Sequence, residues 1–131
     1  MNVDDLFRLS EEVSKDIDYI IEKTSDLKIL FKEFYEEVNR LPAEDKQKIM
    51  KYLNRAGVPH VAVIWTPDGF EEWTVAWEYD PDEDLILITS HDEVDYGGEI
   101  VVFEPDDLDR WTALIMLREL ADAVLGAFSD A

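Results

Sequence analysis

Cysteine is absent from this chain of 131 residues. Its absence excludes disulfide bonds, cysteine-liganded zinc, iron–sulfur clusters and a thiol nucleophile. No hydrophobic run approaches the roughly 20 residues of a membrane span. The N-terminal residues Met1 to Asp5 also lack the basic start and the apolar stretch of a secretory signal. These absences together predict a cytoplasmic protein.

Basic residues are missing from a long internal segment. Between Arg55 and Arg110 lie 54 residues without Lys or Arg, and they include 16 acids. The overall basic content would place about five bases there. The whole chain has 32 acids and 12 bases, a net charge of −20, of which only −3 lies at or before Pro59. A surface adapted to high salt would spread its acids over the chain and use few Lys and Ile, yet seven Lys and ten Ile are present.

The confinement of negative charge to one half of the chain indicates a use there, since such charge costs stability through repulsion. Nucleic acids and membranes are themselves polyanions, so we expect neither as a direct partner. With 47% hydrophobic residues and four Trp, the chain can still bury a core, and its length fits one domain over 1–131. We therefore predict an α+β fold with a helical part over 1–57, a sheet over 60–103 and a C-terminal helix over 105–128.

The helical part is predicted from apolar periodicity. No Gly or Pro occurs from Val3 to Leu41, and apolar residues recur there every seven positions. The repeat consists of Leu6, Val13, Ile20, Leu27, Phe34 and Leu41. This pattern predicts either one long or kinked helix or two helices that meet at Thr24-Ser25-Asp26. A shorter helix follows, between Pro42 and Gly57.

Four antiparallel strands are predicted in the middle part, because short apolar segments alternate with polar turns. The predicted strands are His60–Thr66, Trp73–Tyr79, Leu85–Thr89 and Glu99–Phe103. Their short connections predict a meander. Because the first, third and fourth strands are apolar on both faces, we expect helices to cover most of both faces of the sheet.

The last helix is expected to begin at Pro105, with three Asp in its first turn, where the helix dipole favours negative charge. Its predicted core face leaves Trp111, Ile115 and Met116 outside. This surplus apolar surface indicates either a helix packed between other elements or a homodimer. We expect Trp111 to be a possible partner contact. The other tryptophans follow strand alternation and are predicted to lie in the core: Trp65, Trp73 and Trp77.

Two acidic motifs resemble parts of metal sites. The spacing Asp80-x-Asp82-x-Asp84 begins a calcium loop, but Leu85 and His91 occupy the positions where such a loop needs Gly and Glu. The segment His91-Asp92-Glu93-x-Asp95 could contribute to a metal-dependent hydrolase. The only other histidine, His60, is however expected near the opposite end of the sheet. We predict a hairpin turn and a polar loop instead, with no catalytic residue, metal or cofactor.

The acids themselves form the candidate site. The turn between the second and third strands, and the segment after the fourth, should lie at one end of the sheet. Nine acids would gather there as a partner-binding surface: Glu78, Asp80, Asp82, Glu83, Asp84, Glu104, Asp106, Asp107 and Asp109. Reversing Asp82 and Asp84 to Lys is expected to leave the fold intact, because turn positions are exposed.

The leading hypothesis is a small acidic protein that occupies a basic, nucleic-acid-binding surface of a partner protein. It would act as an inhibitor or nucleic-acid mimic of the anti-defence or immunity type. The alternative is a chaperone or assembly factor that binds a client through apolar helix faces. A metal-dependent hydrolase is the third hypothesis, and a solvated acidic rim that only maintains solubility is the simplest explanation of the charge.

Overall fold

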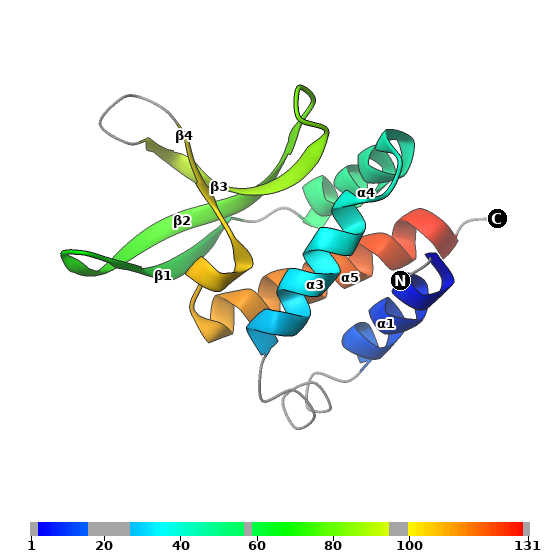
Figure 1. Ribbon diagram of the computed structural model, residues 1–131, viewed down its shortest axis with the longest axis horizontal. Coiled ribbons are helices and arrows are strands. Elements are labelled where there is room, and N and C mark those ends of the chain that lie inside the picture. Colours follow the sequence, from blue (N-terminus) through cyan, green and yellow to red (C-terminus); the bar gives the residue numbers. More distant parts are fainter. Residues whose placement is uncertain (1–2, 16–26, 57–58, 95–99, 130–131) are drawn as a thin grey trace.

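The computed structural model describes residues 3–15, 27–56, 59–94 and 100–129. The elements in chain order are α1 (Val3–Lys15), α3 (Leu27–Asn39), α4 (Ala43–Ala56), β1 (His60–Thr66), β2 (Gly69–Asp80), β3 (Leu85–Val94), β4 (Ile100–Phe103), the 3₁₀ turn η1 (Pro105–Asp107) and α5 (Arg110–Ser129). Figure 1 shows a sheet with the helices gathered on one side of it. The α+β fold predicted from the sequence is confirmed.

The sheet is an antiparallel meander in the order β1-β2-β3-β4. Pro67, Asp68 and Gly69 make the first turn, and Gly69 has a φ of +117°, a left-handed conformation that glycine adopts without strain. β2 and β3 are longer than predicted. His91, expected in a polar loop, belongs to β3, which continues to Val94. The Gly97-Gly98 pair lies outside the described residues.

One face of the sheet packs on the helices. Its buried residues alternate along the strands with the residues of the other face. They are Ala62, Ile64, Val75, Ile86, Ile88 and Phe103. Trp77 from the same face contacts the ring of Phe31 on α3 edge-on, with centroids 6.2 Å apart. These contacts join the sheet and the helices in one core.

The expectation that helices also cover the other face is wrong. α5 explains why, because it contacts α1, α3, α4 and β1. The helices thus pack around α5 on one side, and no described element lies over the far face of the sheet (Figure 1). Met116, predicted outside the core face of this helix, is fully buried. Of the surplus apolar surface of α5, Met116 is therefore used inside the chain, as the first of the two alternatives predicted, whereas Trp111 is exposed.

α5 begins later than predicted. Pro105 opens the short turn η1, and Leu108 is extended. Asp109 then caps α5, because its Oδ2 accepts a hydrogen bond from the backbone N–H of Thr112 at 3.1 Å. Near the other end, a Cβ on Gly126 would lie only 2.5 Å from the ring of Tyr52. Glycine thus allows α4 and α5 to approach closely.

The N-terminal part is helical as predicted. From the heptad pattern, Leu6, Val13, Leu27 and Phe34 are buried. The choice between one kinked helix and two helices at Thr24-Ser25-Asp26 falls outside the described residues, and so does Ile20. Among the helices that the structure describes, none combines the length and the apolar content that a bilayer crossing requires.

Candidate binding surface

The face of the sheet turned away from the helices carries a large exposed apolar surface. We call it the open face. Its exposed large apolar residues are Val61, Val63 and Trp65 on β1, Phe70 on β2, and Ile100 and Val102 on β4. The strand registers place them on one side, because Trp65 pairs with Phe70 and Val102 pairs with Thr89. Four of them lie on the β1–β2 hairpin and two on β4, at the opposite edge of the sheet. Large apolar side chains exposed together on one face mark interaction sites in soluble proteins.

Trp65 is the clearest departure from the predicted core. Its side chain is 67% exposed, and it contacts the ring of Phe70 edge-on, with centroids 4.6 Å apart. The two rings lie at the end of the β1–β2 hairpin, which extends beyond the helices (Figure 1). Alternation correctly separated the two faces of β1, but it could not show which face the helices cover. Trp73 and Trp77, by contrast, pack against the core as predicted.

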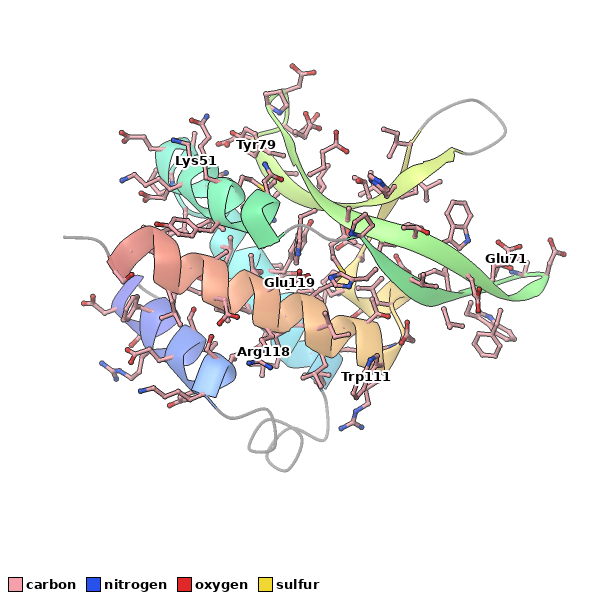
Figure 2. The ribbon with its side chains drawn as sticks, turned by 180° about the vertical axis from the view of Figure 1, so that it is seen from behind. Lys51, Glu71, Tyr79, Trp111, Arg118 and Glu119 are labelled. Carbon is pink, nitrogen blue, oxygen red and sulfur yellow. The ribbon has the colours of Figure 1, made fainter. Side chains whose placement is uncertain are left out.

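Trp111 is exposed, which agrees with its expected role as a possible contact. Its side chain is 70% exposed. The neighbouring Thr112 donates a hydrogen bond from its hydroxyl to the carbonyl oxygen of Val61 at 3.2 Å. This bond places the first turn of α5 at the outer edge of β1. Figure 2 shows Trp111 at that end of the helix.

The charge asymmetry of the sequence coincides with the two layers of the fold. Residues 60–103, a range that includes all four strands, contain 12 acids and no Lys or Arg. All of the chain's bases lie before β1 or after β4. Among the labelled residues of Figure 2, Lys51 and Arg118 lie on helices and Glu71 lies on the hairpin. On the open face, Glu72, Glu78 and Asp80 occupy alternate positions of β2 beside the apolar residues. The open face is therefore both apolar and acidic.

The nine predicted partner-binding acids do not form one cluster. Five of them lie on β2 or in the β2–β3 turn, and Glu104 directly follows Phe103, which pairs with Ile88 of β3. η1 takes the chain away from this end. Asp109 accepts a hydrogen bond from the backbone N–H of Val63 on β1 at 2.9 Å. Val63 pairs with Glu72, eight residues along β2 from Asp80. That separation is about 26 Å, several times the screening length of ~8 Å at physiological salt.

Three acids beyond β4 have partners within the chain. Asp106 accepts hydrogen bonds from Lys32 through its Oδ2 at 3.3 Å and from Lys28 through its backbone oxygen at 3.5 Å. Asp107 caps η1 by accepting from the backbone N–H of Glu104 at 2.8 Å. Partial burial acts to raise the pKa of Asp109, but hydrogen bonds from Val63 and Thr112 outweigh it and hold the pKa below its usual value. Asp106 thus connects η1 to α3, and Asp109 connects β1 to α5.

Asp84 also differs from an exposed turn residue. Its Oδ2 lies 3.0 Å from Nζ of Lys46, and its Oδ1 accepts a hydrogen bond from the hydroxyl of Tyr79. Tyr79 and then Lys46 lower the pKa of Asp84 below its ordinary value. The ammonium group of Lys46 thus contacts the last carboxylate of the Asp80-x-Asp82-x-Asp84 motif. Reversing Asp84 to Lys would remove these contacts, so Asp84 is not the simple exposed turn position on which the expectation of an intact fold depends.

The acids that face solvent at the turn are Asp82 and Glu83. Asp80 shapes the turn, because its Oδ1 accepts hydrogen bonds from the backbone N–H groups of both residues, at 2.9 and 3.4 Å. Asp84, with φ of 55°, takes the left-handed conformation that Asp tolerates better than most residues. A pair of substitutions at Asp82 and Glu83 therefore changes charge at this turn without removing its internal contacts.

The two histidines were expected near opposite ends of the sheet, and this is wrong. His60 pairs with Val75, which pairs with Ser90, the neighbour of His91. His60 is directed to α5 instead, where its Nε2 lies 2.8 Å from Oε1 of Glu119. Burial raises the pKa of Glu119, and His60 offsets part of that increase. Within the part of the chain that the structure describes, no three or more His, Asp or Glu side chains converge as a metal site requires.

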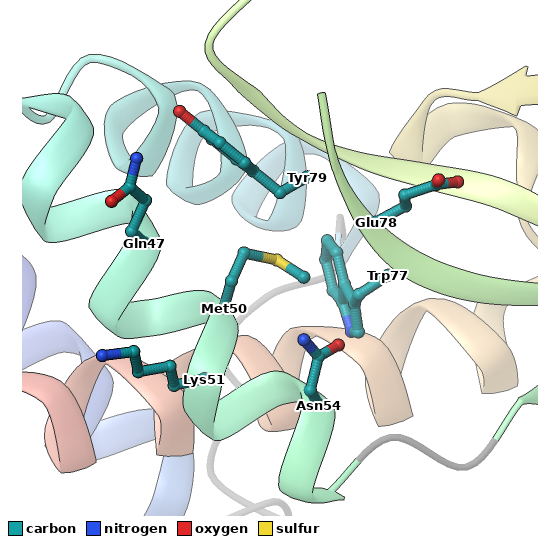
Figure 3. Close-up of a pocket in the computed structure, with 7 residues that line it drawn as sticks. All are labelled: Gln47, Met50, Lys51, Asn54, Trp77, Glu78 and Tyr79. Atoms are coloured by element: carbon teal, nitrogen blue, oxygen red, sulfur yellow. The ribbon is translucent and has the colours of Figure 1, made fainter. Parts of the chain in front are cut away.

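A hollow of about 360 Å³ lies between α4 and β2 (Figure 3). Gln47, Lys51 and Asn54 line its α4 side, and Trp77 and Tyr79 line the β2 side. Figure 3 shows Glu78 directed to the other side of the strand from Trp77 and Tyr79, toward the open face. Adjacent residues of β2 therefore point to different surfaces, the hollow and the open face, as strand alternation requires.

The concentration of acids in the sheet predicts that salt stabilises the fold. We expect the melting temperature to rise by about 3–5 °C between 10 and 300 mM NaCl, because the screening length shortens from about 30 Å to less than 8 Å. Thermal unfolding followed by circular dichroism measures this. The double variant D82N/E83Q, which lacks two of the turn charges, should gain less from salt. An unchanged melting temperature in the wild type would show that the acids are not crowded.

The open face is the most prominent exposed apolar surface that the described residues form. Among the residues described here, the open face brings together apolar side chains and carboxylates, and it includes no Lys or Arg. Such a surface complements one that is apolar and basic. Comparisons of this chain with models of known protein families, with curated proteins and with solved structures find no match.

Proposed function

We propose that this chain is a small acidic binding protein that docks through its open face onto a basic, nucleic-acid-binding surface of a partner protein. Competition with nucleic acid for that surface would make it an inhibitor or a nucleic-acid mimic. The observation that carries the proposal is the open face itself, because it exposes six large apolar residues among carboxylates. Apolar contacts would hold the partner, and the charge would accelerate and orient its approach.

The charge also argues against a second copy of this chain as the occupant of the open face. Two copies that met through this face would bring together Glu72, Glu78 and Asp80 of each copy, and the described strands offer no Lys or Arg to pair with them. Like charges placed opposite each other across an interface cost several kcal/mol. A basic partner has the opposite effect. The homodimer expected from α5 gains little support, since α5 packs against α1, α3, α4 and β1 of its own chain.

The alternative, a chaperone that binds through apolar helix faces, has less support. Among the described helices, the large apolar residues that are exposed are Ile29 on α3 and Trp111 on α5. The remaining apolar stripes pack in the core. The helices therefore present single apolar residues, whereas the sheet presents six on one face.

Affinity capture with matched variants tests the proposed function. The full chain is immobilised in lysate of its own cells at 50 and 300 mM salt, and captured proteins are identified by mass spectrometry. We expect a basic nucleic-acid-binding protein, recovered more weakly at the higher salt and displaced by nucleic acid. With that purified partner, the open-face variant V63S/V102S should bind about tenfold more weakly, because two apolar contacts are lost.

Ile29→Ser is the matched control, since Ile29 is 53% exposed but lies on α3, away from the open face. Its affinity should stay within twofold of the wild type. Equal binding by the wild type and V63S/V102S would contradict docking through the open face. A partner that resists salt and is lost with Ile29→Ser would favour the chaperone alternative.

A further inference from the structure

The open face has a groove at the end nearest the β2–β3 turn. It has a volume of about 210 Å³ and is lined by residues of β2, β3 and β4. The strand pairing explains its shape. Leu87 and Thr89 of β3 form the floor, because Leu87 pairs with Glu78 on one side and Thr89 pairs with Val102 on the other. Drug-sized ligands occupy pockets of about 300–1,000 Å³, so this groove is better suited to a single side chain.

Two carboxylates on the β2 side of the groove are held in place. The hydroxyl of Thr89, which is only 6% exposed, donates a hydrogen bond to Oε2 of Glu78 at 3.1 Å. Oδ1 of Asp80 accepts from the backbone N–H groups of the turn. Among the described residues, the second oxygens of Glu78 and Asp80 have no hydrogen-bond donor. Each carboxylate is therefore oriented through one oxygen and available through the other.

The other side of the groove is aliphatic. Ile100 and Val102 of β4, both about half exposed, lie across β3 from the two carboxylates. The nearest Lys to this end, Lys46, is buried and bound to Asp84 on the opposite side of the turn. No cation of the described chain thus occupies the groove. Its occupant must combine an apolar stem with a cationic end.

Arginine fits these requirements better than lysine. Glu78 and Asp80 stand two residues apart on one face of a strand, about 7 Å from each other. A planar guanidinium has five donors and can bond to carboxylates on more than one side, whereas an ammonium is a compact and strongly hydrated charge. The methylene stem of arginine would pack on Leu87, Ile100 and Val102.

We infer that this groove receives an arginine side chain from the partner. Glu78 and Asp80 bind the guanidinium, and the aliphatic residues of β3 and β4 cover its stem. The inference rests on the proposed function for the origin of the arginine, since the partner supplies it. The groove itself can be tested without the partner.

The test uses the full-length ¹⁵N-labelled chain and three small probes, Nα-acetyl-arginine amide and its lysine and citrulline counterparts. Backbone amide shifts are followed by NMR during each titration. The arginine probe should shift the amides of Leu87, Thr89 and Val102 and bind most tightly, and citrulline, which lacks the charge, should bind least. Shifts confined to other regions, or equal binding of citrulline and arginine, would overturn the inference.

Two variants with the same change of charge sharpen the test. Glu78→Gln removes a groove carboxylate but keeps an oxygen that accepts from Thr89, so its fold should be retained. It should weaken binding of the arginine probe about fivefold or more. Glu83→Gln, at an exposed turn position, should change it less than twofold. Equal effects of the two variants would show that general charge, and not the groove, attracts arginine.

The same two variants separate this inference from the proposed function. If the captured partner binds both variants equally but is lost with V63S/V102S, docking through the open face stands and the arginine groove is wrong. If the arginine probe binds at the groove but no basic partner is captured, the groove stands and the proposed function is wrong.

Discussion

Replacing Asn39 with Ala is expected to lower the free energy of unfolding by about 3 kcal/mol. The side chain of Asn39 at the end of α3 takes the place of a neighbouring strand. Its Nδ2 donates to the carbonyl oxygen of Ile86 at 3.1 Å, and its Oδ1 accepts from the N–H of Ile86 at 2.7 Å. β4 does not pair with Ile86, because the last residue of β4, Phe103, pairs with Ile88. Alanine would leave both backbone groups of Ile86 without their partners.

Urea unfolding of wild type and variants measures this loss. Asn39→Asp should be at least as destabilising as Asn39→Ala, because a carboxylate oxygen would face the carbonyl oxygen of Ile86 where an amide now donates. Asn54→Ala, an exposed position on α4, is the control and should change stability by less than about 0.5 kcal/mol. A loss under 1 kcal/mol for Asn39→Ala would show that water replaces the asparagine at little cost.

The features that sequence patterns predicted well are local ones. The alternation from Trp73 to Tyr79 matches the faces of β2 directly, because each side chain in a strand faces opposite to its neighbour. Pro67-Asp68-Gly69 specified the first turn through the conformations available to its residues. The helix between Pro42 and Gly57 was likewise bounded by residues that start or stop helices. None of these inferences needed distant contacts.

The open face could not be predicted because it depends on the number of helices available to cover the sheet. The apolar residues on both faces of β1 show that both could be buried, but not that both are. α5 decides the outcome, since its apolar circumference is filled by α1, α3 and α4. In the sequence, this helix was compatible with a sandwiched position, which its pattern favoured, or with a face that meets another subunit.

The acidic site was predicted in part. The meander correctly placed Glu78 through Asp84 together, because those acids belong to one hairpin. Asp109 was misplaced, since η1 and the bond from Val63 to Asp109 direct the chain across to β1. One signal for the groove was present in the sequence: Glu78 and Asp80 alternate with Trp77 and Tyr79, which places the two carboxylates on the face opposite the core.

Replacing Lys46 with Met is expected to lower the free energy of unfolding by about 3 kcal/mol. Lys46 is only 3% exposed, although it begins on the surface helix α4. Its Nζ donates to the carbonyl oxygens of Asp84 at 2.5 Å and of Asn39 at 3.3 Å, and it pairs with the Asp84 carboxylate. Methionine would fill the space of the stem but leave these three acceptors without their common donor.

This loss of stability should be accompanied by weaker binding of arginine in the groove, because Lys46 and Asn39 hold the start of β3 and the turn next to Asp80. We expect Lys46→Met to bind Nα-acetyl-arginine amide more weakly than the wild type, although Lys46 itself is not part of the groove. Lys48→Met, at an exposed position of the same helix, removes an equal charge and should preserve both stability and probe binding. Unfolding of Lys46→Met and Lys48→Met at the same urea concentration would contradict this prediction. It would show that the hydrogen bonds of the Lys46 ammonium add nothing to stability and that other contacts hold the turn.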